Sequence, residues 1–234
     1  MKAVLRRELS AYFHSPIGYV FLAVFYFFSG YFFTFTCLRS MNASLSGVFA
    51  GLFSILLFLV PILTMRLMSE ELRSKTDQLL LTSPLSLTGM VLGKYLAALL
   101  VYLLGISITL VYALVISTMA SPHWPVVLSC FLGALLLGMA MIAIGMFISS
   151  LTQNQVIAAV GGFAVALFLI LIDGLGFYLT NETLVALVMS LSFYQRFQSF
   201  ALGILSLSGV GFFLGVTAIF IFLTVRVFEK RRWS

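Results

Sequence analysis

Few residues of this chain have types that could do chemistry, and the densest group of them lies between residues 65 and 93. Glu70 and Glu71 are adjacent carboxylates, which could act as general acid and base if a partner lay within hydrogen-bond reach. The segment Gly89-Met-Val-Leu-Gly93-Lys94-Tyr95 is close to the pattern of a phosphate-binding loop. That loop needs four residues between its glycines and Ser or Thr after the lysine, so no nucleotide site is predicted in this chain.

The composition is typical of a membrane protein. Of the 234 residues, 62% are apolar and only 9% are charged, whereas soluble domains are about half apolar and a quarter charged. A crossing needs about 20 apolar residues, so the length allows roughly six crossings and no separate soluble domain. Cys37 and Cys130 have no second Cys or His at ligand spacing, so neither a disulfide nor a metal site is expected.

Six apolar runs are long enough to span a bilayer. They are apolar on all sides, which excludes the alternating strands of a membrane barrel, and only a helix satisfies its own backbone polar groups in lipid. We therefore predict an all-α polytopic membrane protein, one domain over residues 1–234, with six transmembrane helices. They are expected at about Ile17 to Cys37, Val48 to Met65, Met90 to Ser117, Val126 to Ile148, Val156 to Phe177 and Ser206 to Val225.

The basic residues indicate which way the helices face. With the N-terminus inside the cell, only Arg39 and Arg196 of the 13 basic residues fall outside. An excess of Lys and Arg on the cytoplasmic side is the usual pattern, so both termini are predicted to be cytoplasmic. The inside residues are Lys2, Arg6, Arg7, Arg66, Arg73, Lys75, Lys94, Arg226, Lys230, Arg231 and Arg232.

The first 15 residues predict a helix that lies in the cytoplasmic interface. Val4, Leu5, Leu9 and Tyr12 cluster on one helical face. Arg6, Arg7 and Ser10 point away from it. Pro16 ends this helix before the first span. Two interpretations stay open, a basic anchor that only orients the protein and an elbow helix packed against the bundle.

The loop of residues 66–88 is too charged to cross the membrane, because each charge would cost about 3 kcal/mol at the bilayer centre. It predicts a short cytoplasmic helix over Glu70 to Leu81, with i,i+4 pairs of Glu71 with Lys75 and Arg73 with Asp77. Lys94, at the start of the third span, is expected to snorkel to the interface. The helix is suited to the groove of a partner protein, and a solvated loop that only sets topology is the alternative. The candidate contact residues are Glu70, Glu71, Arg73, Lys75, Asp77, Leu79 and Leu80.

A catalytic use of the glutamate pair is not expected. Intramembrane glutamate proteases have Glu-Glu-x-x-x-Arg on a helix with histidines nearby, and this chain has Lys75 at the arginine position. Its only histidines, His14 and His123, fall on opposite sides of the membrane in the predicted topology. No acid–base site can then assemble, and the chain is not predicted to be an enzyme.

Residues 178–205 form an outer segment that is too polar in its first half to span. Aromatic residues around one arginine favour an interfacial or partly re-entrant outer helix. The residues concerned are Phe193, Tyr194, Arg196, Phe197 and Phe200. Asp173, near the end of the fifth span, is expected at the outer interface as a helix-end polar residue.

Four short patterns, in this order along the chain, resemble the membrane subunits of type-2 ATP-binding-cassette (ABC) transporters, especially the gliding-motility-associated branch. Lys75 and Asp77 depart from it, since the family has glycine and glutamate at these positions. The patterns are Arg7-Glu8-Leu9 through Ser15-Pro16-Ile17-Gly18-Tyr19; Arg66 and Glu70-Glu71 with Lys75-Thr76-Asp77 and Leu79 to Leu81; Ser83-Pro84 and Gly93-Lys94; and Ser149-Ser150-Leu151-Thr152-Gln153-Asn154-Gln155.

The resemblance implies the permease half of an ATP-driven transporter in a bacterial inner membrane, in which the loop helix couples the spans to an ATPase. Thr152, Gln153 and Asn154 would be a second cytoplasmic contact, and the outer segment would help to form an extracellular gate. The expected partners are an ABC ATPase dimer that binds ATP and magnesium, a second permease, the lipid bilayer and an extracellular accessory protein. No nucleic acid and no cofactor of this chain are expected. A stand-alone secondary carrier or channel is the alternative.

Overall fold

The computed structural model describes residues 2–74, 86–118, 120–175 and 189–233, and within these ranges it contains helices and no strands. Six helical segments are long and apolar enough to cross a membrane, which confirms the predicted all-α polytopic fold. The segments are Pro16–Leu38, Ser46–Ser74, Leu87–Ser117, Trp124–Leu151, Gln155–Gly174 and Leu207–Arg231. Each contains one of the predicted spans, apart from differences of a few residues at the ends.

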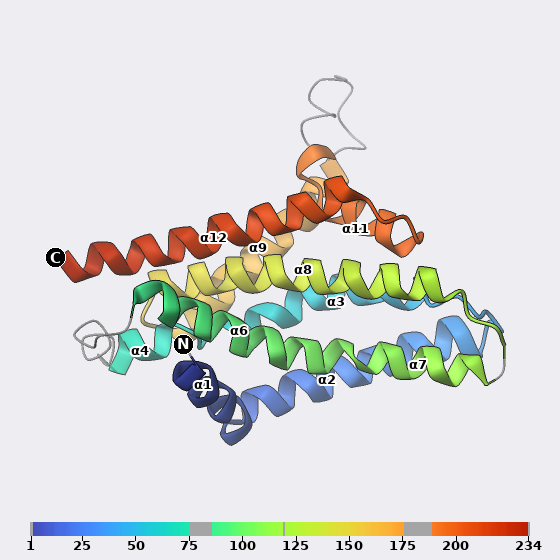
Figure 1. The fold of residues 1–234 in the computed structure, drawn as a ribbon, viewed down its shortest axis with the longest axis horizontal. Coiled ribbons are helices and arrows are strands. Elements are labelled where there is room, and N and C mark those ends of the chain that lie inside the picture. Colours follow the sequence, from blue (N-terminus) through green and yellow to red (C-terminus); the bar gives the residue numbers. More distant parts are fainter. Residues whose placement is uncertain (1, 75–85, 119, 176–188, 234) are drawn as a thin grey trace.

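The spanning helices run broadly along the long axis of the molecule at differing tilts, with α8 (Trp124–Leu151) at the centre (Figure 1). It packs against α3 (Ser46–Thr64), α6 (Leu87–Ile106), α9 (Gln155–Leu175) and α12 (Leu207–Trp233). Three glycines allow this close packing: a Cβ at Gly133, Gly138 or Gly145 would overlap Phe200, Tyr102 or Thr64, respectively. Small residues on α8 therefore position the neighbouring helices.

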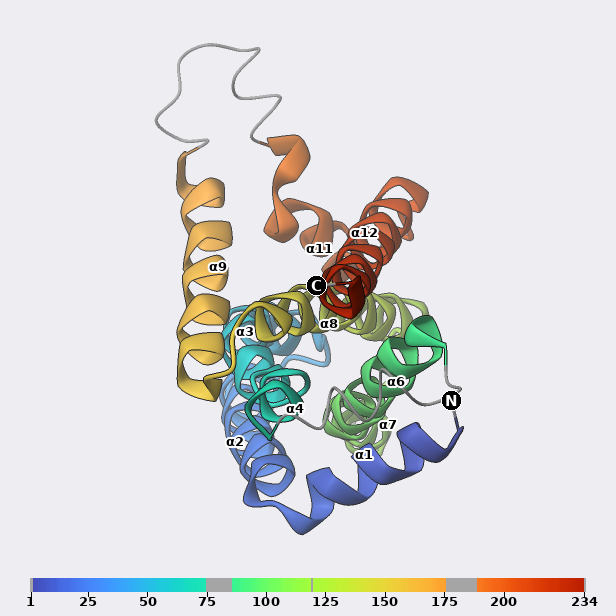
Figure 2. The same cartoon turned by 90° about the vertical axis from the view of Figure 1, so that its left-hand side faces the viewer.

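One end of the bundle carries nearly all of the described charge, and we call it the charged end. It holds α4 (Ser69–Ser74), the first turn of α6 and the last turns of α8 and α12 (Figure 1). Here α1 (Lys2–His14) lies across the bundle, from the start of α2 (Pro16–Phe33) to the side of α6 (Figure 2). The buried Val4 and Tyr12 face the bundle, as the hydrophobic face of this helix predicts.

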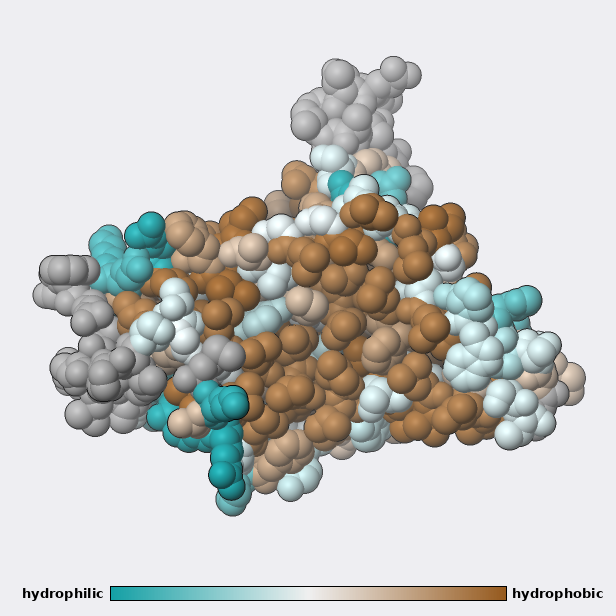
Figure 3. Space-filling model, in the orientation of Figure 1, coloured by the Kyte–Doolittle hydropathy of each residue, from teal (hydrophilic) through white to brown (hydrophobic). Residues whose placement is uncertain are grey.

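On the face seen in Figure 3, an apolar belt lies between more hydrophilic ends. Large apolar side chains are exposed there, for example Phe27 (70%), Val156 (68%) and Phe168 (61%). Such an extent of exposed apolar surface would be unfavourable in water and is favourable in hydrocarbon. The belt is the surface expected to contact lipid.

Two local irregularities were not predicted. The third span is interrupted at Ser107, between α6 and α7 (Ile108–Ser117), where the Ser107 hydroxyl donates to the carbonyl of Leu104 at 2.7 Å. The first span ends in η1 (Thr34–Leu38), one turn of π-helix. Serine and threonine side chains that bond to preceding carbonyls compete with the helical backbone, and hydropathy does not reveal this effect.

Candidate functional site

A buried ion network at the charged end joins three elements that are far apart in the sequence. The Nζ of Lys94, on α6, lies 3.1 Å from Oε1 of Glu8 on α1 and 3.0 Å from Oε1 of Glu71 on α4. It also donates a hydrogen bond of 2.8 Å to the carbonyl of Leu67. The Lys94 side chain is only 2% exposed, so these three oxygens replace the water that its charge would otherwise bind.

Arg7 provides the second cation of this network. Its Nη2 lies 2.8 Å from Oε1 of Glu8 and 2.6 Å from Oε1 of Glu71. Two cations thus face two carboxylates, which is the balance that makes burial of charge tolerable. Burial raises the pKa of the Glu8 carboxyl, but the nearby charges of Lys94 and Arg7 and their hydrogen bonds outweigh burial and hold the pKa below its usual 4.5.

This lowered pKa predicts a loss of stability in acid. Because the folded state holds Glu8 ionised to lower pH than the unfolded state does, its stabilising contribution is complete above about pH 4.5 and is lost as the pH falls through the folded pKa. The thermal midpoint of the purified chain, measured in detergent from pH 7 to pH 3, should therefore fall at the acid end. Glu8→Gln should flatten this fall, and an equally steep acid limb in the variant would contradict the assignment.

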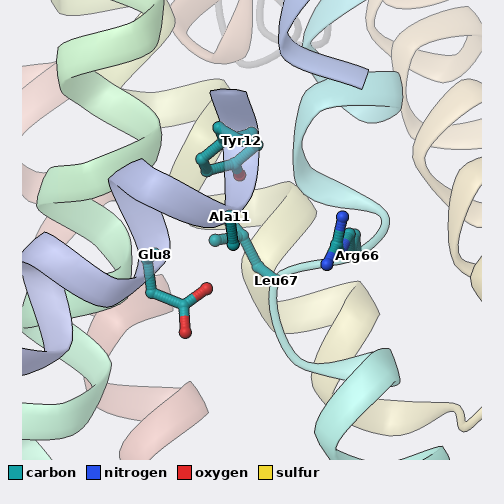
Figure 4. Close-up of a pocket in the computed structure, with 5 residues that line it drawn as sticks. All are labelled: Glu8, Ala11, Tyr12, Arg66 and Leu67. Carbon is teal, nitrogen blue, oxygen red and sulfur yellow. The ribbon is translucent and has the colours of Figure 1, made fainter. Parts of the chain in front are cut away.

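The turn between α3 and α4 lies against α1, next to the network. The Tyr12 hydroxyl donates to the carbonyl of Leu63 at 2.9 Å, and Arg66 forms an ion pair with Glu70 one turn later. Glu8, Tyr12, Arg66 and Leu67 line a cavity of about 10 Å³ here (Figure 4), which has room for about one water molecule. α1 therefore bonds to the last turn of α3 and faces Arg66 and Leu67 of the turn across this cavity.

The end of α8 contributes to the same region through Ser149. Its hydroxyl accepts hydrogen bonds from the backbone amides of Met68 (3.1 Å) and Ser69 (3.0 Å) and donates to the carbonyl of Met65 (3.0 Å). The first amides of a helix have no partner inside the helix, so Ser149 caps α4 from a neighbouring span. Four elements, α1, α4, α6 and α8, consequently meet at one point.

We expect Ser149→Ala to weaken this junction. The change leaves two buried amides and one carbonyl without their partner, which costs about 1 to 3 kcal/mol, and the thermal midpoint in detergent should fall accordingly. Ser150→Ala is the matched control, because Ser150 is equally buried but its hydroxyl donates only to Phe147 of its own helix. Equal losses in the two variants would argue against the cap.

The structure divides the predicted contact residues of α4 into two groups. Glu71 is 7% exposed and lies inside the network, so it offers little surface to another protein. Arg73 is exposed, and the Glu70 side chain is 45% exposed. The described helix ends at Ser74, and Lys75, Asp77, Leu79 and Leu80, with the two predicted i,i+4 pairs, lie outside the described residues.

The predicted second contact forms the turn between α8 and α9. The amide of Asn154 donates to the Thr152 hydroxyl at 3.1 Å, and the Asn154 side-chain oxygen accepts from the amide of Val156 at 2.9 Å. This second bond caps the start of α9. Gln153 and Asn154 are exposed, so the turn presents polar side chains at the charged end.

The prediction for Lys94 was wrong, since its side chain is buried in the network and does not reach the interface. The parts played by Arg7, Glu8 and Ser149 in joining these elements were also missed. One signal was present in the sequence: a lysine inside an apolar helix that cannot reach water needs a buried carboxylate, and Glu8 and Glu71 were among the few available.

At the opposite end, α11 (Phe193–Ala201) packs against α8, α3 and α9. Its first turn is capped by Ser192, whose hydroxyl accepts from the amide of Gln195 and donates to Asp173 of α9. Phe193, Phe197 and Phe200 are buried, whereas Tyr194 is 39% exposed. Of the predicted outer segment, residues 189–205 are described.

Arg196 links α11 to α12. Its guanidinium donates to the hydroxyl of Ser208 at 2.8 Å and to the carbonyl of Ser190 at 3.0 Å. It also lies 4.5 Å from the centre of the Phe212 ring, a favourable position for a cation over an aromatic face. The residues singled out in the sequence share α11, but the ring beside Arg196 is Phe212 of α12, which the sequence analysis did not single out.

Comparison with known proteins gives the family. A family model described as ABC-2 family transporter protein matches residues 38–228. A search of curated proteins found no match. The matched region covers all but the first of the six spanning segments, together with the turn that carries Arg66 and Glu70. The chain therefore belongs to the ABC-2 family of transporter proteins and is a membrane permease of an ABC transporter.

Proposed function

We propose that the chain is the permease half of an ATP-driven exporter and that α4 transmits the movement of a separate ATPase to the spans. The observation that carries this proposal is the division of α4. Arg73 is exposed, and Glu70, paired with Arg66, is 45% exposed, whereas Glu71 lies inside and is bonded to α1 and α6. A short helix with one free face and one anchored face is suited to this task.

The orientation follows from the charge. Among the described residues, ten Lys or Arg lie on the helices and turns that meet at the charged end, and only Arg39 and Arg196 lie elsewhere. The positive-inside tendency therefore supports placing the charged end, with both termini, in the cytoplasm of a bacterial cell. The partner ATPase, which would bind ATP and magnesium, would then meet α4 and the turn at Gln153 from the cytoplasmic side.

The contacts of α4 suggest how the movement passes on. A displacement of α4 would act on α1 and α6 through Glu71, and on α8 through Ser149. Because buried ion pairs resist separation, these elements would move together as a rigid group. Two such permeases would pass substrate by alternating access, with α11 as part of an outer gate.

We also propose that the chain belongs to the gliding-motility-associated branch of the family. This proposal rests on the four sequence patterns alone.

The test is to purify the tagged chain in mild detergent, identify co-purifying proteins by mass spectrometry and measure ATP hydrolysis. Arg73→Glu should release the ATPase or uncouple hydrolysis from transport without changing the thermal midpoint. Arg39→Glu, an equal charge change at the opposite end, is the control. Glu71→Gln should lower the midpoint. A chain that purifies without an ATPase under conditions that preserve known ABC complexes would favour a stand-alone carrier or channel.

A further inference from the structure

The exposed face of α1 carries two cations, Lys2 and Arg6, that are not part of the buried ion network. Lys2, Arg6 and Ser10 follow one another at intervals of four residues, so they form a row along one side of the helix. All three are exposed. Lys2 and Arg6 have no acidic partner among the described residues, since the carboxylates of Glu8 and Glu71 are engaged by Arg7 and Lys94.

This row borders a shallow, largely open depression on the outer surface of α1. Lys2, Ala3, Arg6, Arg7 and Ser10 line it. Ala3 leaves space between the longer side chains, and the Arg7 side chain, although bonded through Nη2 to the network, is still 53% exposed. Arg and Lys bind phosphate oxygens by charge-assisted hydrogen bonds. The Ser10 hydroxyl, 3.2 Å from Nδ1 of His14, is a further polar group beside them. The lining is therefore chemically suited to a phosphate group.

The position of the row on the helix indicates where that phosphate comes from. On one side the row adjoins Leu5, Leu9 and Phe13, which are half-buried. Phe13, near the end of α1, contacts Tyr19 in the first turns of α2, with ring centres 5.9 Å apart, and Tyr19 is 58% exposed. A cationic row between apolar side chains and water is the arrangement of a helix lying at the level of lipid headgroups.

We propose that this face of α1, formed by Lys2, Arg6 and Ser10 with the adjoining side of Arg7, is a binding site for the phosphate headgroup of an anionic lipid. The site is separate from the proposed ATPase contact on α4 and does not depend on it. Positive charges attract anionic headgroups over about a Debye length. The neighbouring apolar side chains give a lipid an advantage over free phosphate, because its acyl chains lie against them.

The test is native mass spectrometry of the full chain in detergent, titrated with phosphatidylglycerol or with phosphatidylcholine of the same acyl chains. Phosphatidylglycerol should bind in preference. Arg6→Gln should weaken its binding about fivefold, and the double variant Lys2→Gln with Arg6→Gln about 25-fold, as expected for one and two headgroup-level cations. Arg6→Lys should restore most of the affinity. Unchanged thermal midpoints would show that these exposed substitutions leave the fold intact.

Two controls separate a built site from general attraction. Lys230→Gln removes an exposed cation from α12 at the same end, and Arg39→Gln removes one at the opposite end; neither should change phosphatidylglycerol binding. Equal losses in Lys230→Gln and Arg6→Gln would overturn the proposal in favour of diffuse charge. Equal binding of the two lipids would overturn it as well. Displacement of phosphatidylglycerol by an equal concentration of inorganic phosphate would show a free-anion site in place of a lipid site.

Discussion

Lys94→Met is expected to lower the thermal midpoint of the purified chain more than any other single change at the charged end. Methionine keeps most of the volume but removes the cation that lies 3.1 Å from Glu8 and 3.0 Å from Glu71. Arg7 alone then faces two buried carboxylates, and the Leu67 carbonyl loses its donor. Removing one partner of a buried ion pair costs about 3 to 5 kcal/mol. We therefore expect a fall on the order of 10 °C, measured in detergent.

The controls for Lys94→Met test charge balance. Lys230→Met removes an exposed lysine and should change stability by less than about 0.5 kcal/mol. Adding Glu71→Gln to Lys94→Met leaves one cation, Arg7, facing one carboxylate, Glu8. Part of the lost stability should then be recovered, so the effects of the two changes on stability should be far from additive. If Lys94→Met were as stable as the unchanged chain, or if the double variant showed simple additivity, the network would not be what holds α1, α4 and α6 together.

The fold was largely predictable because its determinants are local. A run of about 20 apolar residues can only be a helix in lipid. Four of the six predicted runs lie within the observed spanning segments, and the other two overlap them except for a few residues at one end. The amphipathic face of α1 also follows from spacing alone, since Val4 and Tyr12 are the residues that become buried. The irregularities at Ser107 and Thr34–Leu38 depend on side-chain hydrogen bonds and on packing, which periodicity does not contain.

The candidate site was predictable only in part because its contacts are long-range. The Glu70-Glu71 pair could be singled out, but the sequence suggested the neighbour Lys75 as the partner of Glu71. The described partners are Arg7, 64 residues away, and Lys94. The local pairing rule holds for an isolated, solvated helix. Once α4 packs against α1, the desolvated Glu71 needs cations close by, and Arg7 and Lys94 supply them from other helices.

Packing of α6 against α8 depends on Gly138, and Gly138→Ala is expected to be strongly destabilising. A Cβ at this position would lie 2.2 Å from the ring of Tyr102. Tyr102 is fully buried, and its hydroxyl donates to the carbonyl of Ala134 at 2.6 Å, so the ring cannot turn away without losing this bond. Overpacking costs about 1 to 3 kcal/mol, and a lost buried hydrogen bond adds about 1 to 3 kcal/mol. The thermal midpoint in detergent should fall accordingly.

Gly215→Ala is the matched control, because nothing lies within 4 Å of a Cβ built on Gly215 in α12. Alanine has the higher helix propensity, so this change should leave stability unchanged or raise it by up to about 1 kcal/mol. The clash itself can be isolated with Tyr102→Leu, which shortens the facing side chain. In that background Gly138→Ala should cost little, since the atoms that it would meet are gone. If Gly138→Ala destabilised the Tyr102→Leu variant as much as it destabilises the unchanged chain, the loss would not come from a clash with Tyr102. The close packing of α6 against α8 would then not be the reason for glycine at this position.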